Sequence, residues 1–184
     1  LPKPAGVPAA VAAARVQIPG KGPVELSRER LEGLKNFESF ARLAQASLQR
    51  GRPDDAIRQI AQALSFFDSE LHGPDGRRGL IRLRAAAHGA AGRRKAAVAE
   101  LESIVGEDPA AAELLYEMAR LCYADKDYRG AIAYAERLAA AAPAGPAGYA
   151  LSAAAHAQSG SPRRAIRFFT MSIERVGNAP RFKN

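Results

Sequence analysis

Three side chains of types that bind metal ions recur at equal spacing along this chain. They stand 34 residues apart, at His88, Cys122 and His156. A zinc ion would need all of its ligands within about 2.3 Å. Residues at one position of a repeated, stacked helical unit cannot meet so closely, because packed helices stand about 8–10 Å apart. We therefore predict that these side chains pack between helices and that the chain has no metal site.

Pairs of carboxylates are the second candidate for chemistry, because two acids in one pocket can serve as general acid and general base. The pairs are Asp54–Asp55, Glu107–Asp108 and Asp125 with Asp127. Each pair falls at a predicted turn or helix start, where acids cap backbone N–H groups and complement the helix dipole. No Ser/His/Asp order, phosphate-binding loop or HExxH motif accompanies them. We predict no catalytic residue and no cofactor, and an enzyme is not expected.

The elements that must carry these residues are helices. The chain has 184 residues, of which 47% are hydrophobic, and much of that fraction is alanine. Alanine is the best helix former and lets neighbouring helices approach closely. Apolar residues recur at three- and four-residue steps, as one face of a helix requires. The predicted fold class is all-α, and no apolar run reaches the ~18 residues that a membrane span needs.

Proline and glycine divide the chain into helices and connections. Residues 1–26 are predicted to be a Pro/Ala-rich arm, extended or irregular except for a short helix at 9–16. A short first helix follows Ser27, and a loop is predicted at 72–76. Pairs of helices are predicted at 37–49 and 53–67, 78–90 and 94–106, 111–124 and 128–141, and 147–158 and 162–176. Residues 178–184 form a basic tail with little helical pattern.

The clearest helical pair lies in Leu115–Pro143, and three other segments repeat it. In this pair Ala119 and Ala131 occupy the positions where the two helices would cross, twelve residues apart. The same spacing joins an alanine of the first helix to one of the second in every pair: Ala44 and Ala56, Ala85 and Ala97, Ala119 and Ala131, Ala153 and Ala165. The last three copies follow at intervals of 34 residues, whereas the first precedes the second by 41 and carries its surplus in the predicted loop.

This pattern resembles the tetratricopeptide repeat family, whose units of 34 residues contain two antiparallel helices and commonly end in proline. Pro109 and Pro143 match that ending, whereas Asp68 and Gly177 depart from it. The resemblance implies a right-handed α-solenoid of four repeats within a domain of residues 27–177. The expected repeats are 37–70, 78–111, 112–145 and 146–177.

The resemblance also implies where a partner would bind, because the first helices of such repeats line the concave groove of the stack. The positions carried over from the family give nine candidate residues: Glu38, Gln45, Gln49, Arg82, Glu113, Tyr116, Arg120, Tyr123 and Gln158. Small residues line the remainder and leave room for an apolar segment. Family members that clamp a C-terminal carboxylate carry Asn at the ninth groove position, where this chain has Gln45, Ala86, Arg120 and Ala154.

Four of these candidates are expected to form the main contact patch: Arg82, Tyr116, Arg120 and Tyr123. Guanidinium groups are planar donors for carboxylates, and tyrosine rings are frequent anchors of interfaces. The alternative is that Tyr116 and Tyr123 only pack against neighbouring helices or against the N-terminal arm.

These features predict a non-enzymatic scaffold that binds a peptide or helical segment of a partner protein, for the assembly or localisation of a complex. An acidic or carboxylate-bearing partner would suit Arg82 and Arg120. A second hypothesis is that the chain is the repeat portion of a larger secretion or envelope-assembly protein, because it lacks a starting Met and a polar capping helix. The single cysteine excludes an internal disulfide and does not indicate the compartment.

A third hypothesis is nucleic-acid binding, and it rests on charge. The formal net charge of +8 lies at the two ends, since residues 31–160 contain sixteen basic and sixteen acidic side chains. Within that neutral block seven cations follow one another with no acid between them: Arg77, Arg78, Arg82, Arg84, Arg93, Arg94 and Lys95. Few aromatic residues are interleaved with them as stacking platforms, so nucleic acid is the less favoured partner.

The last predicted helix suggests a further contact. Stacks of this family end in a polar capping helix, and none is recognisable after Val176. Phe168, Phe169 and Ile173 would then expose apolar surface, which commonly marks an interaction site. Self-association through this uncapped C-terminal repeat is therefore predicted.

Overall fold

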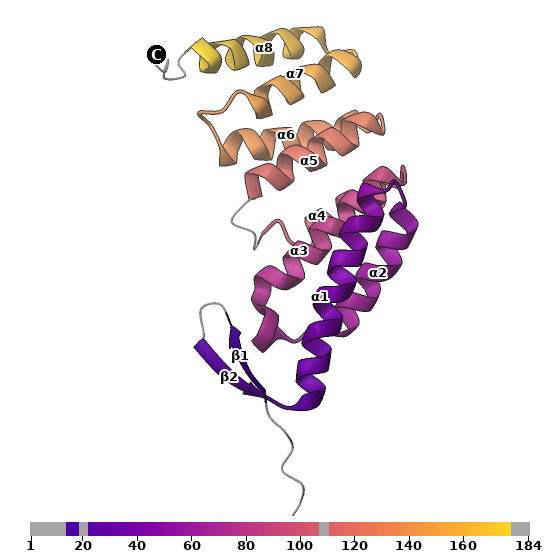
Figure 1. Cartoon of the computed structure of the whole chain (residues 1–184). Helices are drawn as coiled ribbons and strands as arrows, with labels where there is room; N and C mark the ends of the chain where they lie inside the picture. The colour runs from indigo at the N-terminus through magenta and orange to yellow at the C-terminus, as the bar shows by residue number, and fades with distance from the viewer. Residues whose placement is uncertain (1–13, 19–21, 107–110, 178–184) are drawn as a thin grey trace, which may run out of the picture.

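The structure, a computed structural model, describes residues 14–18, 22–106 and 111–177. A hairpin of two strands precedes a row of helices (Figure 1). The strands are β1 (Ala14–Ile18) and β2 (Gly22–Leu26). The helices are α1 (Arg28–Gln49), α2 (Pro53–Ser65), α3 (Ser69–Ala90), α4 (Arg94–Glu102), α5 (Ala111–Ala124), α6 (Tyr128–Ala141), α7 (Ala147–Gln158) and α8 (Pro162–Gly177). The predicted all-α class is confirmed, with the hairpin as a small addition.

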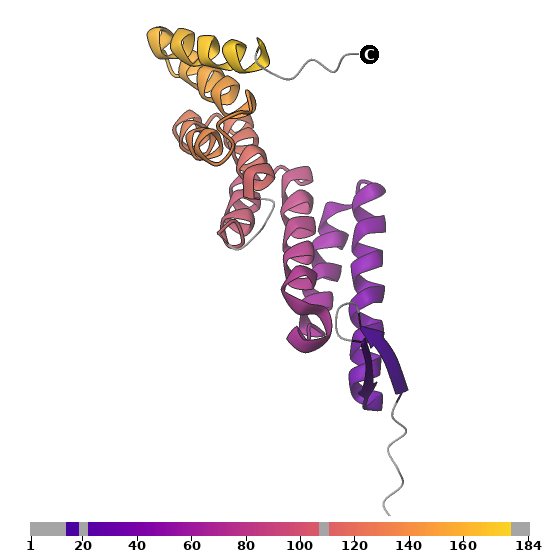
Figure 2. The same ribbon diagram turned by 90° about the vertical axis from the view of Figure 1, so that its left-hand side faces the viewer.

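Successive helices pack in order into a curved stack. The pairs are α1 with α2, α3 with α4, α5 with α6, and α7 with α8, and contacts between α2 and α3, α4 and α5, and α6 and α7 join them. Two views at right angles show the pairs rising from the hairpin to α8 (Figure 1 and Figure 2). None of the described helices is both long and apolar enough to cross a lipid bilayer.

The predicted crossing alanines all lie in the interior of the stack. None is more than 4% exposed: Ala44, Ala56, Ala85, Ala97, Ala119, Ala131, Ala153 and Ala165. A side chain that ends at Cβ lets two backbones approach closely without a cavity or a clash. Gly148 of α7 goes one step further, because a Cβ there would lie only 2.6 Å from the backbone nitrogen of Ala139 in α6. Close backbone contact therefore holds the helix pairs together.

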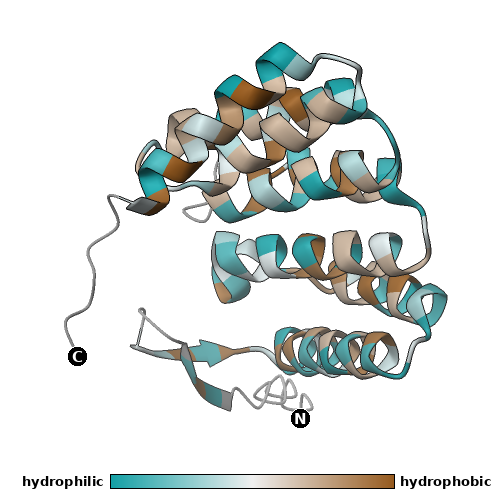
Figure 3. Ribbon diagram, turned by 90° about the horizontal axis from the view of Figure 1, so that it is seen from above, coloured by the Kyte–Doolittle hydropathy of each residue, from teal (hydrophilic) through white to brown (hydrophobic). Residues whose placement is uncertain are grey.

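Larger apolar side chains fill the space between successive pairs. Ile60 of α2 shares a buried cluster with Leu80 of α3, and Leu101 of α4 shares another with Met118 of α5. Along each helix, apolar positions (brown) are interrupted by polar ones (teal), as Figure 3 shows. Because these clusters span the junctions, each helix pair completes its core only with its neighbour, as in other repeat proteins.

The second half of the chain follows its predicted bounds. Helices α5, α6 and α7 begin and end at the predicted residues, and α8 extends one residue further. The start of α6 is fixed locally, because the Asp127 carboxylate accepts a hydrogen bond of 3.0 Å from the backbone nitrogen of Gly130. Helix α4 ends at Glu102, earlier than the predicted residue 106. Residues 107–110, with the predicted pair Glu107–Asp108, lie outside the described residues.

The prediction for the first repeat is wrong at its start. A single helix, α1, takes the place of the short first helix and the separate helix at 37–49. Ser27 caps α1 by accepting a hydrogen bond of 3.3 Å from the backbone nitrogen of Arg30. The Arg30 guanidinium also binds the carboxylates of Asp68 at 2.8 Å and Glu70 at 2.9 Å. Burial acts to raise the pKa of Asp68, but the hydrogen bonds from Arg30 and the backbone outweigh it and lower the pKa. This charged contact ties the first turn of α1 to the start of α3.

The break predicted at residues 72–76 is present but shorter than expected, because α3 consists of two helical segments that meet at a kink at Gly73, directly before Pro74. The Asp68 carboxylate caps the helix by accepting hydrogen bonds from two backbone N–H groups of its first turn. Only Gly73 leaves the helical conformation, with a φ of 62° that favours glycine. The ring of His72 stacks on Phe37 of α1, with 3.7 Å between centroids. The surplus residues of the first repeat therefore form a short helical segment before the kink, and this segment packs on α1.

The predicted N-terminal arm ends in a β-hairpin. Strands β1 and β2 are antiparallel, with Val16 opposite Val24. The helix predicted at 9–16 is thus wrong for residues 14–16, whereas residues 1–13 lie outside the described residues. Alternation of polar and apolar side chains favours strands here, and Leu26, which is 1% exposed, fixes β2 beside α1.

Replacing Gly148 with alanine is expected to lower the free energy of unfolding by about 1–3 kcal/mol, because the new methyl group would meet backbone atoms of α6. Gly33 of α1 is the matched control, since it is helical and a Cβ there would meet nothing within 4 Å. Gly33→Ala should raise the free energy of unfolding by up to about 1 kcal/mol. Urea denaturation of both variants measures the difference, and equal effects would contradict the close approach of α6 and α7.

Candidate functional site

A groove opens on one face of the stack between α3 and α5. It has a volume of about 780 Å³, and side chains of these two helices form most of its lining. Leu101 of α4, Leu138 of α6 and Ala147 of α7 complete it. Because α3, α5 and α7 are the first helices of three successive repeats, the groove lies on the face that those first helices form.

The floor of the groove is apolar and its α3 wall is low. Four floor residues are at most 5% exposed: Ala85, Leu101, Leu114 and Leu138. The wall from α3 consists of small residues: Ala86, Gly89 and Ala90. At Gly89 a Cβ would lie 3.5 Å from the Cδ2 atom of Leu121 in α5, which is an ordinary contact. Apolar side chains of a ligand could therefore enter the groove between α3 and α5 and become buried there, out of contact with water.

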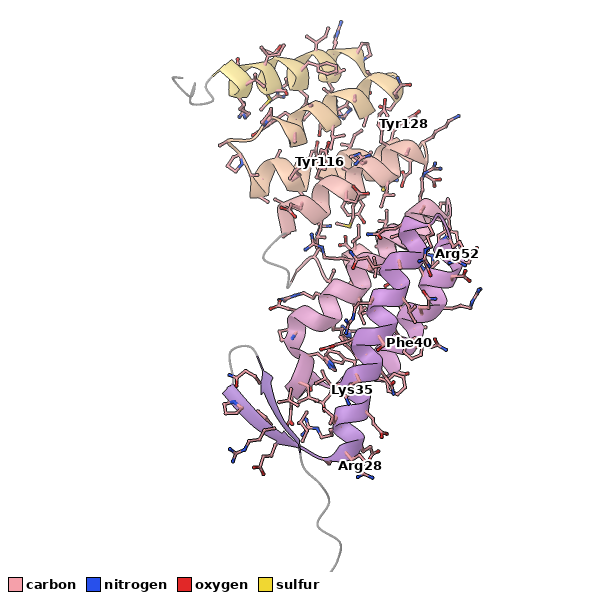
Figure 4. All side chains as sticks on the ribbon, in the orientation of Figure 1. Arg28, Lys35, Phe40, Arg52, Tyr116 and Tyr128 are labelled. Carbon is pink, nitrogen blue, oxygen red and sulfur yellow. The ribbon has the colours of Figure 1, made fainter. Side chains whose placement is uncertain are left out.

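The rim of the groove carries charges and an aromatic ring. Arg82 of α3 and Glu113 of α5 meet at 3.3 Å, and both side chains are substantially exposed. Two turns further along α5 than Glu113, Arg120 pairs with Glu117 at 3.3 Å, and its guanidinium carbon lies 5.8 Å from the centre of the Tyr116 ring. Tyr116 is 40% exposed and lies on α5 as labelled in Figure 4. The rim therefore offers a ligand both signs of charge and one planar apolar surface.

The nine predicted site residues fall into distinct places. Three of them line the groove: Arg82, Glu113 and Tyr116. Arg120 lies next to them through its contacts with Tyr116 and Glu117. Tyr123 packs edge-on against Tyr128 of α6, with 5.6 Å between ring centroids. The other four are exposed on α1 or at the end of α7 and do not line this groove: Glu38, Gln45, Gln49 and Gln158.

Several lining residues were absent from the prediction. Leu101 and Leu138 belong to second helices, so a rule that considers only first helices omits them. Glu117 and Leu121 are on α5, at positions that the family pattern does not assign to the groove. A helical wheel of α5 could have found Glu117, because it lies four residues after Glu113 and so on the same side.

The three evenly spaced metal-binding residue types stay apart in the structure. His88 lies in α3, Cys122 in α5 and His156 in α7. Burial, and then the neighbouring Arg93, lower the pKa of His88, which favours its neutral form. His156 is 4% exposed and stacks on Phe168, with 5.4 Å between centroids. In the part of the chain that the structure describes, no group of three or more His, Cys, Asp or Glu side chains could hold a metal ion.

The carboxylates of the pairs that the structure describes cap a helix or form ion pairs with arginines. Asp127 caps α6, and Asp125 lies 3.7 Å from Arg94 of α4. Asp54 pairs with Arg93, across the junction between α2 and α4. These contacts point the carboxylates toward N–H groups and arginines at the turns. Asp125 and Asp127 both line a small cavity of about 170 Å³, together with Arg94 and Lys95, and there Asp127 is already engaged as a helix cap and Asp125 with Arg94.

Most of the predicted cation run is neutralised by partners. Five of its seven members form ion pairs: Arg78 with Asp75, Arg82 with Glu113, Arg84 with Glu100, Arg93 with Asp54, and Arg94 with Asp125. A phosphate backbone would have to displace these carboxylates, and such paired cations contribute less to nucleic-acid binding than unpaired ones. The charge pattern therefore gives the nucleic-acid hypothesis little support.

Comparisons with known proteins agree with the helical stack. A sequence model described as a tetratricopeptide repeat matches residues 90–155. The structure is similar to that of a protein named MamA, with 17% identity, a TM-score of 0.64, and coverage of 84% of this chain and 89% of that one. It is also similar to MamA from Desulfovibrio magneticus RS-1, with 19% identity, a TM-score of 0.60, and coverage of 76% and 75%.

A third similar structure is a protein described as a kinesin light chain with nearly identical TPR-like repeats, from Podosopora anserina. Its identity is 21%, its TM-score is 0.63, and 79% of this chain and 77% of that one are covered. No curated protein sequence matches the chain. The predicted solenoid of tetratricopeptide repeats is thereby confirmed as the fold.

The thiol of Cys122 should be nearly inert in the folded protein. It is 5% exposed, and burial, with Asp127 and Asp125, raises its pKa to about 11. Since the thiolate is the reactive form, we expect maleimide labelling at pH 8 to be at least about a hundredfold slower than in the urea-unfolded chain. The labelling rate is followed by mass spectrometry, and similar rates in both states would show that the thiol is accessible.

Proposed function

This chain contains tetratricopeptide repeats, and on that basis we propose that it is a non-enzymatic scaffold that holds a segment of a partner protein in the α3–α5 groove. The observation that carries the proposal is one open cavity of about 780 Å³ with an apolar floor and a polar rim. In binding sites, apolar surface supplies affinity, and a few placed polar groups fix the orientation of the ligand. The scaffold would serve the assembly or localisation of a larger complex.

An amphipathic helix is the ligand shape that suits this groove. The small wall residues Ala86, Gly89 and Ala90 let a ligand backbone come close to α3. Leucines from two helices, α5 and α6, supply apolar surface on the other side: Leu114, Leu121 and Leu138. Helices that bind in grooves place apolar anchors at i, i+3, i+4 and i+7. A ligand helix with anchors at this spacing would place them along the apolar floor that runs between α3 and α5.

The charges of the rim favour a ligand that carries a carboxylate. Arg82 already faces the carboxylate of Glu113 at 3.3 Å, on the exposed edge of the groove. A ligand carboxylate could take the place of Glu113 and form the bidentate pair that guanidinium groups favour. Tyr116, beside this pair, offers its ring to the apolar part of the same ligand residue.

Groove binding is tested with helical peptides selected from a displayed library, using the wild-type chain as the only bait, and the selected peptides are then measured against Ala86→Trp. Ala86 is exposed, so a tryptophan there should fill the groove without removing a charge or disturbing the core. Selected peptides should bind Ala86→Trp at least about tenfold more weakly, because their anchors lose the space they occupy. Fluorescence anisotropy gives the dissociation constants.

The same assay tests the rim. For peptides with a carboxylate near the anchors, Arg82→Ala should weaken binding by about fivefold, and Glu113→Gln should strengthen it by removing a competitor. Arg58→Ala is the matched control, since Arg58 pairs with Asp55 on α2, away from the groove. Peptides that bind wild type and Ala86→Trp equally well would overturn the groove as the binding site.

A second proposal is self-association through α8, and a specific observation supports it. Four apolar side chains of α8 are exposed, with Ile166 at 67%, Phe169 at 44%, Ile173 at 70% and Val176 at 61%. An exposed apolar surface of this kind commonly marks an interface.

Self-association predicts a sedimentation coefficient that rises with concentration. Burial of the four α8 side chains between molecules would supply the free energy of association. Sedimentation velocity at protein concentrations from about 1 to about 200 micromolar measures this rise. A single species of monomer size at every concentration would exclude the proposal.

A further inference from the structure

The four turns inside the repeats lie along one edge of the stack. They connect α1 with α2, α3 with α4, α5 with α6, and α7 with α8, and Figure 1 shows all four on its right-hand side. Two ion pairs join the first three turns, Asp54 with Arg93, and Arg94 with Asp125 at 3.7 Å. We call the four turns, each with the first six residues of the helix after it, the turn edge: residues 50–58, 91–99, 125–133 and 159–167.

The turn edge is strongly basic, whereas the opposite edge is not. The turn edge carries eleven Arg and Lys side chains against four Asp. The connections between repeats, counted in the same way over the described residues, carry three acids and no base: Asp68, Glu70 and Glu113. Charge is therefore separated across the stack. Such a field turns the basic edge of a protein toward a negatively charged surface.

The four aspartates of the turn edge are all engaged within the fold. Two form the ion pairs between the turns, Asp55 pairs with Arg52 and Arg58, and Asp127 caps α6. Seven cations of the edge have no ion pair with a described residue, and all are exposed: Arg50, Lys95, Lys126, Arg129, Arg163, Arg164 and Arg167. Only three other described cations lack an ion pair: Arg28, Lys35 and Arg77. Most of the unpaired positive charge is thus gathered on this edge.

The tips of the turns show that one of these cations is kept at a cost. Gly51, Gly92, Lys126 and Gly160 are the middle residues of the four turns, and all have a positive φ, between 62° and 76°. Glycine adopts this left-handed conformation without steric cost, whereas a lysine is strained in it. Lys126 makes no ion pair with a described residue, so its contribution is an exposed charge at the tip. Strained residues of this kind gather at functional positions.

From the unpaired cations and the strained lysine, we infer that the turn edge is a docking surface for an anionic lipid membrane. Anionic headgroups attract cations that come near the membrane surface, and the attraction requires no fixed spacing between the cations. A Cβ at Gly51, Gly92 or Gly160 would meet nothing within 4 Å, so no neighbouring side chain covers these tips. A flat surface can therefore reach the cations beside them.

Nucleic acid fits the turn edge less well than lipid. Single strands are bound by cations together with aromatic rings on which the bases stack. Among the described residues, the arginines that lie over aromatic rings are Arg120, Arg137 and Arg175, and none of them belongs to the turn edge. No residue that lines the α3–α5 groove belongs to the edge either. The groove therefore stays open to a protein partner while the edge lies on a membrane.

Membrane docking is tested by flotation of the full 184-residue chain with lipid vesicles. The chain should bind vesicles of phosphatidylcholine with about 30% phosphatidylserine and should not bind vesicles of phosphatidylcholine alone. Raising the NaCl concentration from about 0.05 to about 0.5 M should weaken binding at least about tenfold, because salt screens the charges. Absence of binding to the anionic vesicles at low salt, or binding that salt does not weaken, would overturn the inference.

The surface is tested with two variants that remove the same charge from different places. Arg129→Gln, at the start of α6, should weaken vesicle binding about fivefold. Lys35→Gln is the matched control, because Lys35 is also exposed and unpaired among the described residues but lies about 20 Å along α1 from the turn edge. Figure 4 labels it well below Arg52 of the edge. Equal weakening by both variants would show that only the net charge matters.

Lys126 separates binding from stability. Lys126→Gly should weaken vesicle binding about fivefold and at the same time raise the melting temperature by about 2–4 °C, because glycine relieves the strained turn. Lys126→Arg keeps both the charge and the strain, so it should match the wild-type chain in both measurements. Loss of binding in a more stable protein cannot come from unfolding. A Lys126→Gly variant that binds as tightly as wild type would contradict the role of this tip.

Two further results would assign the surface differently. A duplex of about 20 base pairs that binds more tightly than the vesicles, and loses affinity in Arg129→Gln, would make nucleic acid the partner of the turn edge and overturn the lipid. Vesicle binding that is lost in Ile173→Asp but unchanged in Arg129→Gln would place the membrane on the exposed apolar side chains of α8 and overturn the turn edge.

Discussion

Close approach of helix backbones at small residues is the constraint on which the rest of this structure depends. A methyl group is all that separates the crossing helices in each pair, and these alanines are buried without exception in the four repeats. Between α6 and α7 even a methyl group is too large, so Gly148 takes the position. A larger side chain at any crossing would force the helices apart and break the clusters that join one pair to the next.

The same use of small residues shapes the groove. Helix α1 contacts α3 and α5 contacts α7 directly, whereas between α3 and α5 an open space remains above a floor of buried leucines. A wall of alanine and glycine leaves the backbone of α3 accessible to a ligand. The rim, in contrast, is already paired, as Arg82 with Glu113 and Arg120 with Glu117. A ligand must offer new partners to these groups, which favours segments with charges at defined positions over apolar segments in general.

Local signals predicted the second half of the fold, and non-local contacts explain the errors in the first half. The bounds of α5 to α7 follow from caps and turns within each unit, such as Asp127 with Gly130. The length of α1 instead depends on Arg30 and Asp68, which are 38 residues apart and carry no shared local pattern. For the site, first-helix positions led to Arg82, Glu113 and Tyr116. Leu101 and Leu138 of the floor were out of reach, because they belong to second helices, and Leu114 of α5 was out of reach because it is a buried core residue.

The end of a stack differs from its interior, because the outer stripe of the last second helix has no following first helix among the described residues to cover it. In the interior, α6 carries Ala135 and Ala139 on this stripe, and α7 approaches them closely. At the corresponding positions α8 carries Phe169 and Ile173. If water alone met this surface, polar residues would be expected, since each Å² of apolar area left exposed forgoes roughly 25 cal/mol. Bulky apolar side chains therefore indicate burial against another surface.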